Sequence, residues 1–375
     1  MTDETPDRDS AGLDIHKLLQ TMVETKASDL HLTAGAPPCL RVNGDIYKVK
    51  SAPLQPADIQ AIAYSVLSEK QKKTFEERNE IDLSFRWKGI SRFRANFFRQ
   101  RGSVAGALRQ IPFEVKTLED LGMPQAMTEL IDKPRGLILV TGPTGSGKST
   151  TLASFIDAIN SKHRGHIITI EDPIEFLHSH KSCIVNQREV GSDTASFQDA
   201  LRYVLRQDPD VVLIGEIRDI ETMEAALRIS ETGHLALATL HTNNAVQTIH
   251  RILDFFPARQ QDMVRTQLSF VLEAIVSQQL IARSDGKGRV MAMELLIPNA
   301  AIRNLIRDDK THQIYSQMQM GQAKFGMITL NQSLMAHVQK RNITIEQALQ
   351  HSYDPEEILA QLAKEQRPGT NLPRR

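Results

Sequence analysis

Residues 142–149 restrict what this chain can fold into more than any other feature of its sequence. They read Gly-Pro-Thr-Gly-Ser-Gly-Lys-Ser and fit the pattern G-x-x-x-x-G-K-[ST] at every fixed position. The apolar stretch 136–141 before them predicts a buried parallel strand, and the stretch 150–159 after them predicts a helix. Because a strand, a glycine-rich loop and a helix follow one another in this order, the motif indicates a phosphate-binding loop.

The chemistry of such a loop suggests roles for its residues. Glycines let backbone N–H groups converge on phosphate oxygens, and the N-terminus of the following helix adds positive potential. Lys148 is expected to reach the β- and γ-phosphates, and the Ser149 hydroxyl to bind Mg²⁺. We therefore predict that the chain binds ATP with Mg²⁺; a glycine-rich turn without a ligand is the alternative. The expected contact residues are Gly142, Pro143, Thr144, Gly145, Ser146, Gly147, Lys148, Ser149 and Thr150.

Composition narrows the class of protein. The chain has 375 residues, enough for two domains, and its 45 basic and 45 acidic residues give no formal net charge. This balance argues against a nucleic-acid-binding surface. Cys39 and Cys183 are too few for a disulfide framework or a four-cysteine zinc site, and they fit a reducing cytosol. No stretch approaches the roughly twenty apolar residues of a membrane span, so we expect at most a peripheral role at a membrane.

Hydrophobic periodicity and turn residues predict the organisation of the chain. Helices are expected at 13–25 and 56–75, a hairpin turn at 43–45, and antiparallel strands at 81–85, 92–97 and 104–109. Strands near 137–141, 166–170, 211–215 and 235–240 alternate with helices, which predicts an α/β domain with helices on both faces of a parallel sheet. The expected segments are a disordered leader at 1–12, an α+β domain at 13–111, a linker at 112–134, the parallel-sheet domain at 135–298, a helical part at 299–355 and a mostly disordered tail at 356–375.

Two acidic motifs follow predicted strands of the second domain. In a parallel sheet the carboxyl ends of the strands face the ligand, so Glu171 in the motif 169–175 is a candidate for catalysis or metal binding. An acidic turn that ends at Pro173 is the alternative. The apolar stretch 210–215 leads to Glu216, which is the layout of a Walker B element. A carboxylate there can bind Mg²⁺ through water or polarise the attacking water.

Histidines and arginines provide further candidates. His234 and His241 stand at either end of a predicted strand, seven residues apart, so a regular strand would direct them to opposite faces. They are a poor metal pair; hydrogen bonding at the surface and sensing of the γ-phosphate both stay open. Five arginines crowd the end of the first domain, and guanidinium groups are suited to binding phosphate oxygens. These are Arg92, Arg94, Arg99, Arg101 and Arg109.

The four motifs together resemble those of the secretion and type IV pilus superfamily of hexameric ATPases. Residues 142–149 are similar to its Walker A motif, 169–175 to its Asp box, 213–219 to its atypical Walker B motif and 233–243 to its His box. Within the superfamily, residues 301–308 resemble the AIRNLIRE-type signature of pilus retraction ATPases, with Asp308 in place of Glu. Pilus-assembly and type II secretion ATPases are longer and usually carry a four-cysteine zinc insertion, which two cysteines cannot build.

This resemblance implies a PAS-like N-terminal domain, a RecA-like ATPase domain and a homohexamer that hydrolyses ATP at its subunit interfaces. The implied function is retraction of type IV pili for twitching motility, at the cytoplasmic face of the inner membrane. The implied partners are the inner-membrane pilus platform protein and an accessory retraction ATPase, with no nucleic acid. Alternatives are an accessory retraction ATPase, a pilus-assembly or type II secretion ATPase, a nucleotide-gated assembly factor, and a nucleic-acid motor with a RecA-like core.

Matched by motif, the resemblance also implies roles for individual residues. Lys148 and Ser149 correspond to the nucleotide and Mg²⁺ residues. Glu216 and Glu171 are the candidate carboxylates for Mg²⁺ binding and water activation, and the sequence does not divide these two roles. The remaining expected functional residues are Arg94 and Arg109, lent across a subunit interface, and His234 and His241, the coupling histidines.

Overall fold

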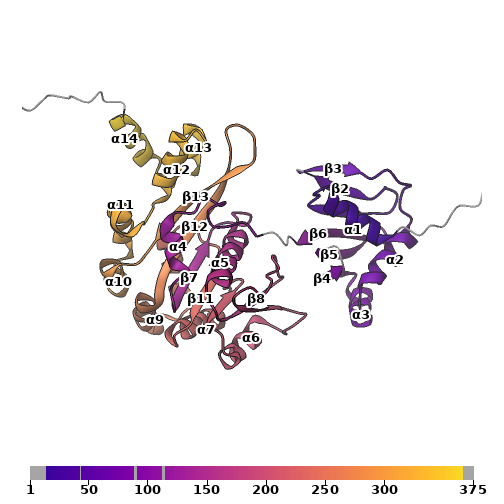
Figure 1. Ribbon diagram of the computed structural model, residues 1–375, viewed down its shortest axis with the longest axis horizontal. Helices are drawn as coiled ribbons and strands as arrows, with labels where there is room; N and C mark the ends of the chain where they lie inside the picture. Colours follow the sequence, from indigo (N-terminus) through magenta and orange to yellow (C-terminus); the bar gives the residue numbers. More distant parts are fainter. Residues whose placement is uncertain (1–13, 43, 88–90, 112–114, 366–375) are drawn as a thin grey trace, which may run out of the picture. The chain divides into compact units, whose positions relative to one another are not determined.

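The computed structural model describes residues 14–42, 44–87, 91–111 and 115–365. The chain divides into two compact units, Met1–Glu114 and Val115–Arg375 (Figure 1). The predicted leader at 1–12 and the end of the predicted tail, 366–375, lie outside the described residues, as does Asn43 of the predicted hairpin turn.

The first unit is built on one antiparallel sheet of six strands, in the order β3-β2-β1-β6-β5-β4. The predicted antiparallel strands are therefore confirmed, and they are joined by a core in which Leu30, Phe93 and Phe97 are fully buried. The strands are β1 (Asp29–Leu32), β2 (Cys39–Val42), β3 (Asp45–Lys48), β4 (Glu80–Trp87), β5 (Ser91–Gln100) and β6 (Ser103–Ile111).

Three helices accompany this sheet. In α1 (Ile15–Glu24), the Asp14 side chain caps the first turn, and the apolar residues at helical spacing are buried as predicted. The single helix predicted at 56–75 is wrong, because the chain forms α2 (Pro56–Val66) and α3 (Glu69–Arg78) instead. Ser68 has an extended backbone and forms a capping box with Gln71, and this box starts a new helix.

The second unit contains a sheet of seven strands in the order β13-β12-β7-β11-β10-β8-β9. All neighbouring strands are parallel except β12 and β13, which form an antiparallel pair at one edge. Four strands agree with the prediction: β7 (Gly136–Thr141), β8 (His166–Glu171), β10 (Val211–Ile214) and β11 (Leu235–Leu240). Three strands were not predicted: β9 (Ile184–Glu189), β12 (Leu272–Ala282) and β13 (Arg289–Leu296).

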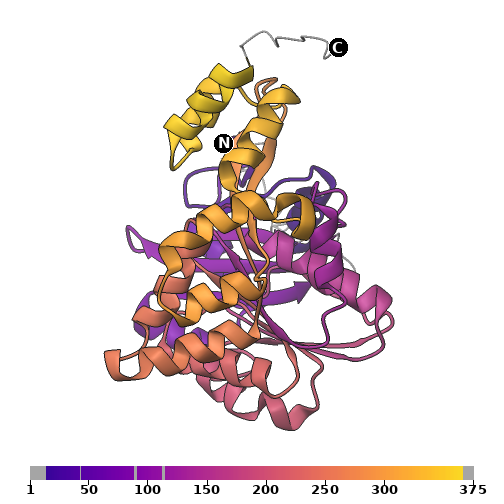
Figure 2. The ribbon, with the colours of Figure 1, turned by 90° about the vertical axis from the view of Figure 1, so that its left-hand side faces the viewer.

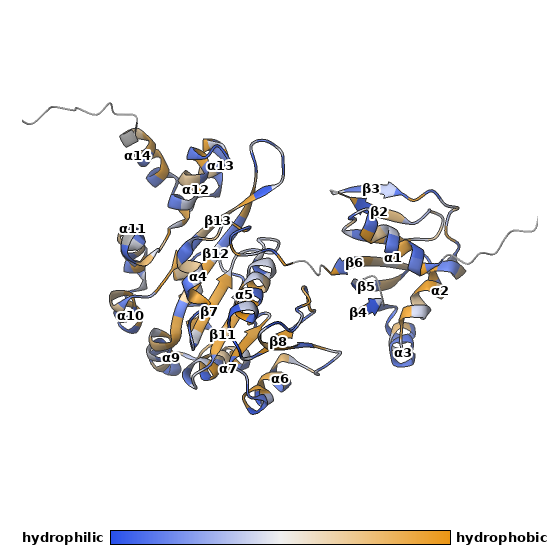
Figure 3. Ribbon diagram, viewed as in Figure 1, coloured by the Kyte–Doolittle hydropathy of each residue, from blue (hydrophilic) through white to orange (hydrophobic). Residues whose placement is uncertain are grey.

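Helices cover both faces of this sheet, as its apolar strands require (Figure 3). Successive residues of β7 alternate between two cores: Leu137 and Leu139 belong to one, and Ile138 and Val140 to the other. The first core includes side chains from α6 (Phe197–Val204), α7 (Ile220–Glu231), α8 (Ala245–Asp254), α9 (Ala258–Val271) and α10 (Ala300–Arg307). The second includes side chains from α4 (Gln125–Leu130) and α5 (Lys148–Lys162).

Helix α4 lies within the stretch that sequence analysis assigned to a linker. Its Met127 and Leu130 are buried in the second core of the sheet, so the chain from residue 115 onward belongs to the second unit. The predicted fold class is confirmed: an N-terminal antiparallel-sheet domain precedes a mostly parallel-sheet domain with a helical C-terminal part. No helix in the described part of the chain is both long and apolar enough to cross a bilayer.

The C-terminal part consists of α11 (Ile314–Phe325), α12 (Leu330–Gln339), α13 (Ile345–His351) and α14 (Pro355–Glu365), in the orange-to-yellow part of the colour scale in Figure 2. Sequence analysis placed most of α14 in a disordered tail. Its Ile358 is fully buried, however, and its Glu357 accepts hydrogen bonds of 2.6 Å from Tyr315, Gln319 and Asn331. These contacts join α14 to α11 and α12 and account for its order.

Candidate nucleotide-binding site

The loop at 142–149 connects β7 directly to α5. Gly142, Gly145 and Gly147 have φ angles of 139°, 79° and 91°, in the region that side chains rarely adopt, and Gly147 caps the helix that begins at Lys148. A Cβ on Gly142 would lie 2.3 Å from the carbonyl oxygen of Gln278. The backbone therefore requires glycine at residue 142, where the loop leaves β7. The loop then leads directly into the N-terminus of α5.

Lys148 folds back over this loop. Its Nζ donates hydrogen bonds to the carbonyl oxygens of Gly142, at 2.8 Å, and Pro143, at 3.2 Å. Partial burial lowers the pKa of Lys148, while the negative charges of Glu216 and Glu175 act in the opposite direction. An ammonium group held against the glycine-rich loop and near carboxylates is suited to binding the phosphate chain of a nucleotide with a divalent cation.

Strand register brings the predicted motifs to one edge of the sheet. Thr141 of β7 pairs with Leu240 of β11, and Ile214 of β10 pairs with Ile170 of β8. Because these strands are parallel, the loop, His241, Glu216 and Glu171 all follow carboxyl ends at the same edge. The structure therefore brings together the Walker A, Asp box and Walker B motifs with the second histidine of the His box.

Glu216 has two basic side chains as partners at this edge. Its Oε2 accepts a 2.7 Å hydrogen bond from Arg218, and its Oε1 lies 3.2 Å from Nε2 of His241. Burial raises the pKa of Glu216, but the hydrogen bonds and charges of Arg218 and His241 outweigh this effect and hold the pKa below its usual value. Glu216 is consequently ionised at neutral pH.

Gly215 explains why this Walker B element departs from an unbroken apolar strand. Its backbone donates to Ile170 O at 2.8 Å and accepts from the Thr239 hydroxyl at 2.5 Å. A Cβ at this position would lie 3.2 Å from Ile170 O and 3.3 Å from the Cα atom of Glu171. The missing side chain lets the end of β10 approach β8 closely, which brings the two candidate carboxylates to neighbouring strand ends.

Glu171 has a different environment from Glu216. It accepts hydrogen bonds from the Thr169 hydroxyl, at 2.6 Å, and from Nε2 of Gln187, at 3.3 Å, and no cation pairs with it in the described residues. Burial raises the pKa of Glu171 to about 7, against the opposing effect of these hydrogen bonds. A carboxyl group with this pKa can accept or release a proton near neutral pH.

His234 does not join the other candidates within this unit. It precedes β11 at the opposite end from His241, where its carbonyl accepts from the N–H of Gly136. Seven residues of extended chain span about 23 Å. The Nδ1 atom of His234 lies 3.1 Å from the Thr232 hydroxyl and 3.3 Å from Ile229 O, so the ring stabilises the turn after α7.

Arg94 and Arg109 are directly opposite each other on β5 and β6 of the first unit. Cross-strand partners share a face of the sheet, so two positive charges are adjacent there. Arg109 donates a 2.8 Å hydrogen bond to Asp29 and keeps 67% of its side chain exposed, while Arg94 lies 4.0 Å from Asp82. Burial raises the pKa of Asp29, but hydrogen bonds from Ser28 and Arg109 lower it by more, so Asp29 is a carboxylate that balances the charge of Arg109.

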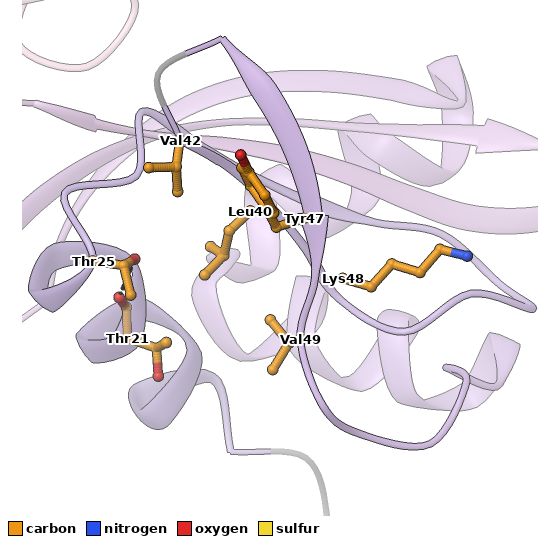
Figure 4. A pocket seen from close by; sticks show the side chains of 7 residues that line it. All are labelled: Thr21, Thr25, Leu40, Val42, Tyr47, Lys48 and Val49. Carbon is orange, nitrogen blue, oxygen red and sulfur yellow. Dashed lines mark hydrogen bonds between the residues drawn. The ribbon is translucent and has the colours of Figure 1, made fainter.

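A separate hollow in the first unit has a different character (Figure 4). It has a volume of about 430 Å³ and lies against α1 and the β2–β3 hairpin. Figure 4 shows the Lys48 ammonium directed away from the threonines of α1. Its walls are mainly apolar and contain no glycine-rich loop, so this hollow does not resemble a phosphate-binding site. The residues that line it are Thr21, Thr25, Leu40, Val42, Tyr47, Lys48 and Val49.

Sequence analysis missed Gln278 of β12. Its side chain is 1% exposed and makes hydrogen bonds to Ser146 O, at 2.8 Å, and to the Thr151 hydroxyl, at 3.0 Å. A polar residue within a buried strand beside the glycine-rich loop is the signal that could have identified it. That signal is visible only once β12 is recognised as a strand.

Together, the loop and the acidic strand ends define the class of P-loop nucleotide-binding proteins with a mostly parallel sheet. Residues 5–365 match the family model described as type II/IV secretion system protein, and the chain belongs to this family. Within the family it is a homologue of the type IV pilus retraction ATPases, as the following comparisons show.

The chain is 49% identical over 344 residues to "Type IV pilus retractation ATPase PilT" of Pseudomonas aeruginosa, covering 92% of this chain and 99% of that protein. It is 45% identical over 340 residues to "Type IV pilus ATPase PilU" of the same organism, covering 91% and 89%. A crystal structure of the pilus retraction motor PilT with bound ADP superposes with a TM-score of 0.88 at 55% identity, covering 93% of this chain and 99% of that one. The predicted family resemblance is confirmed.

Proposed function

We propose that this chain hydrolyses ATP as a homohexamer and that the hydrolysis drives retraction of type IV pili, supporting twitching motility. The observation that carries the proposal is the arrangement at one sheet edge, where Lys148 and its loop lie at the same strand ends as an ionised Glu216 and a partly buried Glu171. The 49% identity to a retraction ATPase over almost its whole length supports retraction as the output.

In this proposal the loop binds the phosphates and Lys148 neutralises them. The N–H groups of the first turn of α5 have no partners within the helix, so they are available to phosphate oxygens. Lys148 would exchange its bonds to the carbonyl oxygens of Gly142 and Pro143 for bonds to the β- and γ-phosphates. The related retraction motor is described with bound ADP, which fits this assignment.

Mg²⁺ is proposed as the accompanying cation, and the oxygen donors of the site fit it. The Ser149 hydroxyl in the first turn of α5 and the Glu216 carboxylate, acting through water, would hold it. The described residues contain no group of three or more histidine, cysteine or acidic side chains that could bind a metal alone. Mg²⁺ typically completes its shell with phosphate oxygens and water, and it would neutralise charge on the phosphates.

We assign the two carboxylates different roles on the basis of their surroundings. Glu216 is ionised and paired with Arg218 and His241, so it serves as a fixed negative charge toward Mg²⁺. Glu171 has a pKa of about 7 and is the better acceptor for the proton of the attacking water. His241 contacts Glu216 directly, so its position would respond to the state of the site.

The proposed hexamer accounts for the arginine pair. Arg94 and Arg109 keep 45% and 67% of their side chains exposed, so both guanidinium groups can extend to a neighbouring subunit's nucleotide. They would there stabilise charge that develops on the γ-phosphate. His234 is proposed as a coupling residue at the opposite end of β11. The inner-membrane pilus platform protein, and an accessory retraction ATPase, are the proposed partners at the cytoplasmic face.

Two experiments test this function. The purified chain should hydrolyse ATP with Mg²⁺, and Lys148→Ala should abolish turnover because the phosphate charge is no longer neutralised. Stimulation by DNA with a steep salt dependence would instead indicate a nucleic-acid motor. Wild-type protein without turnover would overturn the ATPase assignment.

Deletion of the gene in its own organism separates retraction from assembly. Loss of retraction predicts hyperpiliated cells without twitching, and loss of assembly predicts cells without pili. The 45% identity to the PilU protein makes an accessory role the second candidate. An accessory protein would leave residual retraction after deletion, whereas the principal motor would leave none.

A further inference from the structure

A buried amide on the neighbouring strand contacts both ends of the phosphate-loop turn. Gln278 of β12 donates from Nε2 to Ser146 O, at 2.8 Å, and accepts at Oε1 from the Thr151 hydroxyl, at 3.0 Å. All three residues are at most 3% exposed. Because Ser146 lies before the helix and Thr151 lies in its first turns, the amide fixes the transition from loop to helix from the side of the sheet.

The bond to Ser146 determines where the next N–H group points. The Ser146–Gly147 peptide is trans, so its carbonyl and its N–H point in opposite directions. The carbonyl is directed toward Gln278 and the sheet, and the N–H of Gly147 is therefore directed away from the sheet. This is the side on which a loop of this kind presents its N–H groups to phosphate oxygens.

Close packing leaves this arrangement little freedom. A Cβ on Gly142 would lie 2.3 Å from the Gln278 carbonyl, and a Cβ on Gly147 would lie 3.2 Å from Nε2 of Gln278. The backbone on both sides of the turn therefore rests against the same residue. The strand pairing of Ser277 with Thr141 and the 2.7 Å contact between their hydroxyls fix β12 against β7 at this point.

We propose that Gln278 is a positioning residue of the nucleotide site, which sets phosphate affinity by orienting the peptide between Ser146 and Gly147. It touches no substrate and acts through the loop. The inference rests on nucleotide binding at this loop, and it adds a determinant from a strand outside the four motifs. Without the amide, the Ser146 carbonyl loses its buried partner and the peptide can rotate.

The test compares Gln278→Met with a matched control on the adjacent residue, Gln279→Met. Methionine keeps length and volume but removes both hydrogen bonds. Gln279 bonds instead to Tyr353, at 2.6 Å, and His351, at 3.0 Å, in the C-terminal part. Titration of full-length protein with a fluorescent ADP analogue should show a dissociation constant about tenfold higher for Gln278→Met, the effect of about one to two hydrogen bonds. Gln279→Met should bind like wild type.

A second variant keeps the test decisive if Gln278→Met folds poorly, and a kinetic measurement on folded Gln278→Met separates positioning from a structural defect. Thr151→Val removes one bond to the amide and should weaken ADP binding by roughly threefold. In steady state, Gln278→Met should raise KM for ATP with kcat little changed, because the loop holds the phosphates in both ground and transition states. A structural defect would lower kcat and the melting temperature without ligand.

The outcomes separate this inference from the proposed function. Wild-type protein that binds no ADP contradicts nucleotide binding itself. Wild-type protein that binds ADP, together with Gln278→Met of equal affinity, overturns the positioning role alone. Equal losses in Gln278→Met and Gln279→Met also overturn it, because they would reflect general damage to β12.

Discussion

The contrast between two carboxyl groups with a raised pKa allows a sharp test of the assignment of Glu171. Glu171 and Glu294 both have a pKa raised by burial to about 7, but Glu171 ends β8 and bonds to Thr169 and Gln187, whereas Glu294 bonds to the first residue of α8. Glu294 lies in β13 and accepts a 2.7 Å hydrogen bond from the N–H of Ala245. The variants Glu171→Gln and Glu294→Gln therefore each remove a carboxyl group with a pKa of about 7, but from different strands of the sheet.

The effect on stability follows from proton linkage. Each group has a pKa near 4.5 in the unfolded chain and about 7 in the fold, so the folded state binds more protons between these values. The free energy of unfolding of the wild type consequently falls as pH rises from about 4.5 to 7. A shift of this size corresponds to at most about 3 kcal/mol per group. Either glutamine variant should therefore gain several degrees in melting temperature relative to wild type at pH 8, and no advantage at pH 4.5.

The effect on catalysis distinguishes the two groups. If Glu171 accepts the proton from the attacking water, kcat/KM of the wild type should rise with pH and level off above about 7. Glu171→Gln should lose roughly 10²- to 10⁴-fold in kcat/KM and lose this dependence. Glu294→Gln should keep the wild-type value of kcat/KM and its dependence on pH. It also serves as the control for any pH dependence that comes from titration of ATP itself. A profile shared by the wild type and Glu171→Gln would refute the assignment of Glu171.

Three further predictions follow from other contacts. Gly142→Ala should abolish binding of ADP in a fluorescence titration while the rest of the unit stays folded, because the Cβ would lie 2.3 Å from Gln278 O; normal binding would contradict the loop geometry. His241→Ala should raise the pKa of Glu216 by removing a partner at 3.2 Å and should lower kcat more than ADP affinity; equal effects on both would argue for a binding role. Ile358→Ala should cost about 2–5 kcal/mol of local stability and speed hydrogen exchange in α14; unchanged exchange would show that α14 is not docked.

The motifs at the carboxyl edge of the sheet were predictable because each combines a local pattern with a general rule of parallel sheets. The stretches 136–141 and 211–214 are mainly apolar and short, and both become central strands. The rule that ligands bind beyond the carboxyl ends then places Lys148 and Glu216 at one edge. The different environments of Glu171 and Glu216 were not predictable, because they depend on side chains from other strands, such as Gln187 and His241.

Strand β12, the break between α2 and α3, and helix α14 were not predicted, because they depend on tertiary contacts that local sequence patterns do not show. Strand β12 begins at Leu272, directly after α9 ends at Val271, with no glycine or proline to mark the change. Its polar residues Gln278 and Gln279 also interrupt the apolar pattern of a buried strand. The break between α2 and α3 depends on the capping box at Ser68, and the order of α14 depends on one buried side chain and one glutamate.

The strand order β7-β11-β10 determines the width of the nucleotide site. Strand β11 lies between β7, which leads to Lys148, and β10, which leads to Glu216. The backbones of β7 and β10 are therefore two strand spacings apart, roughly 10 Å. A phosphate group with a cation and a water molecule fills a gap of this width. Without them, the side chains of Lys148 and Glu216 are less able to contact each other across it. The end of β11, which leads to His241, therefore faces whatever occupies this gap.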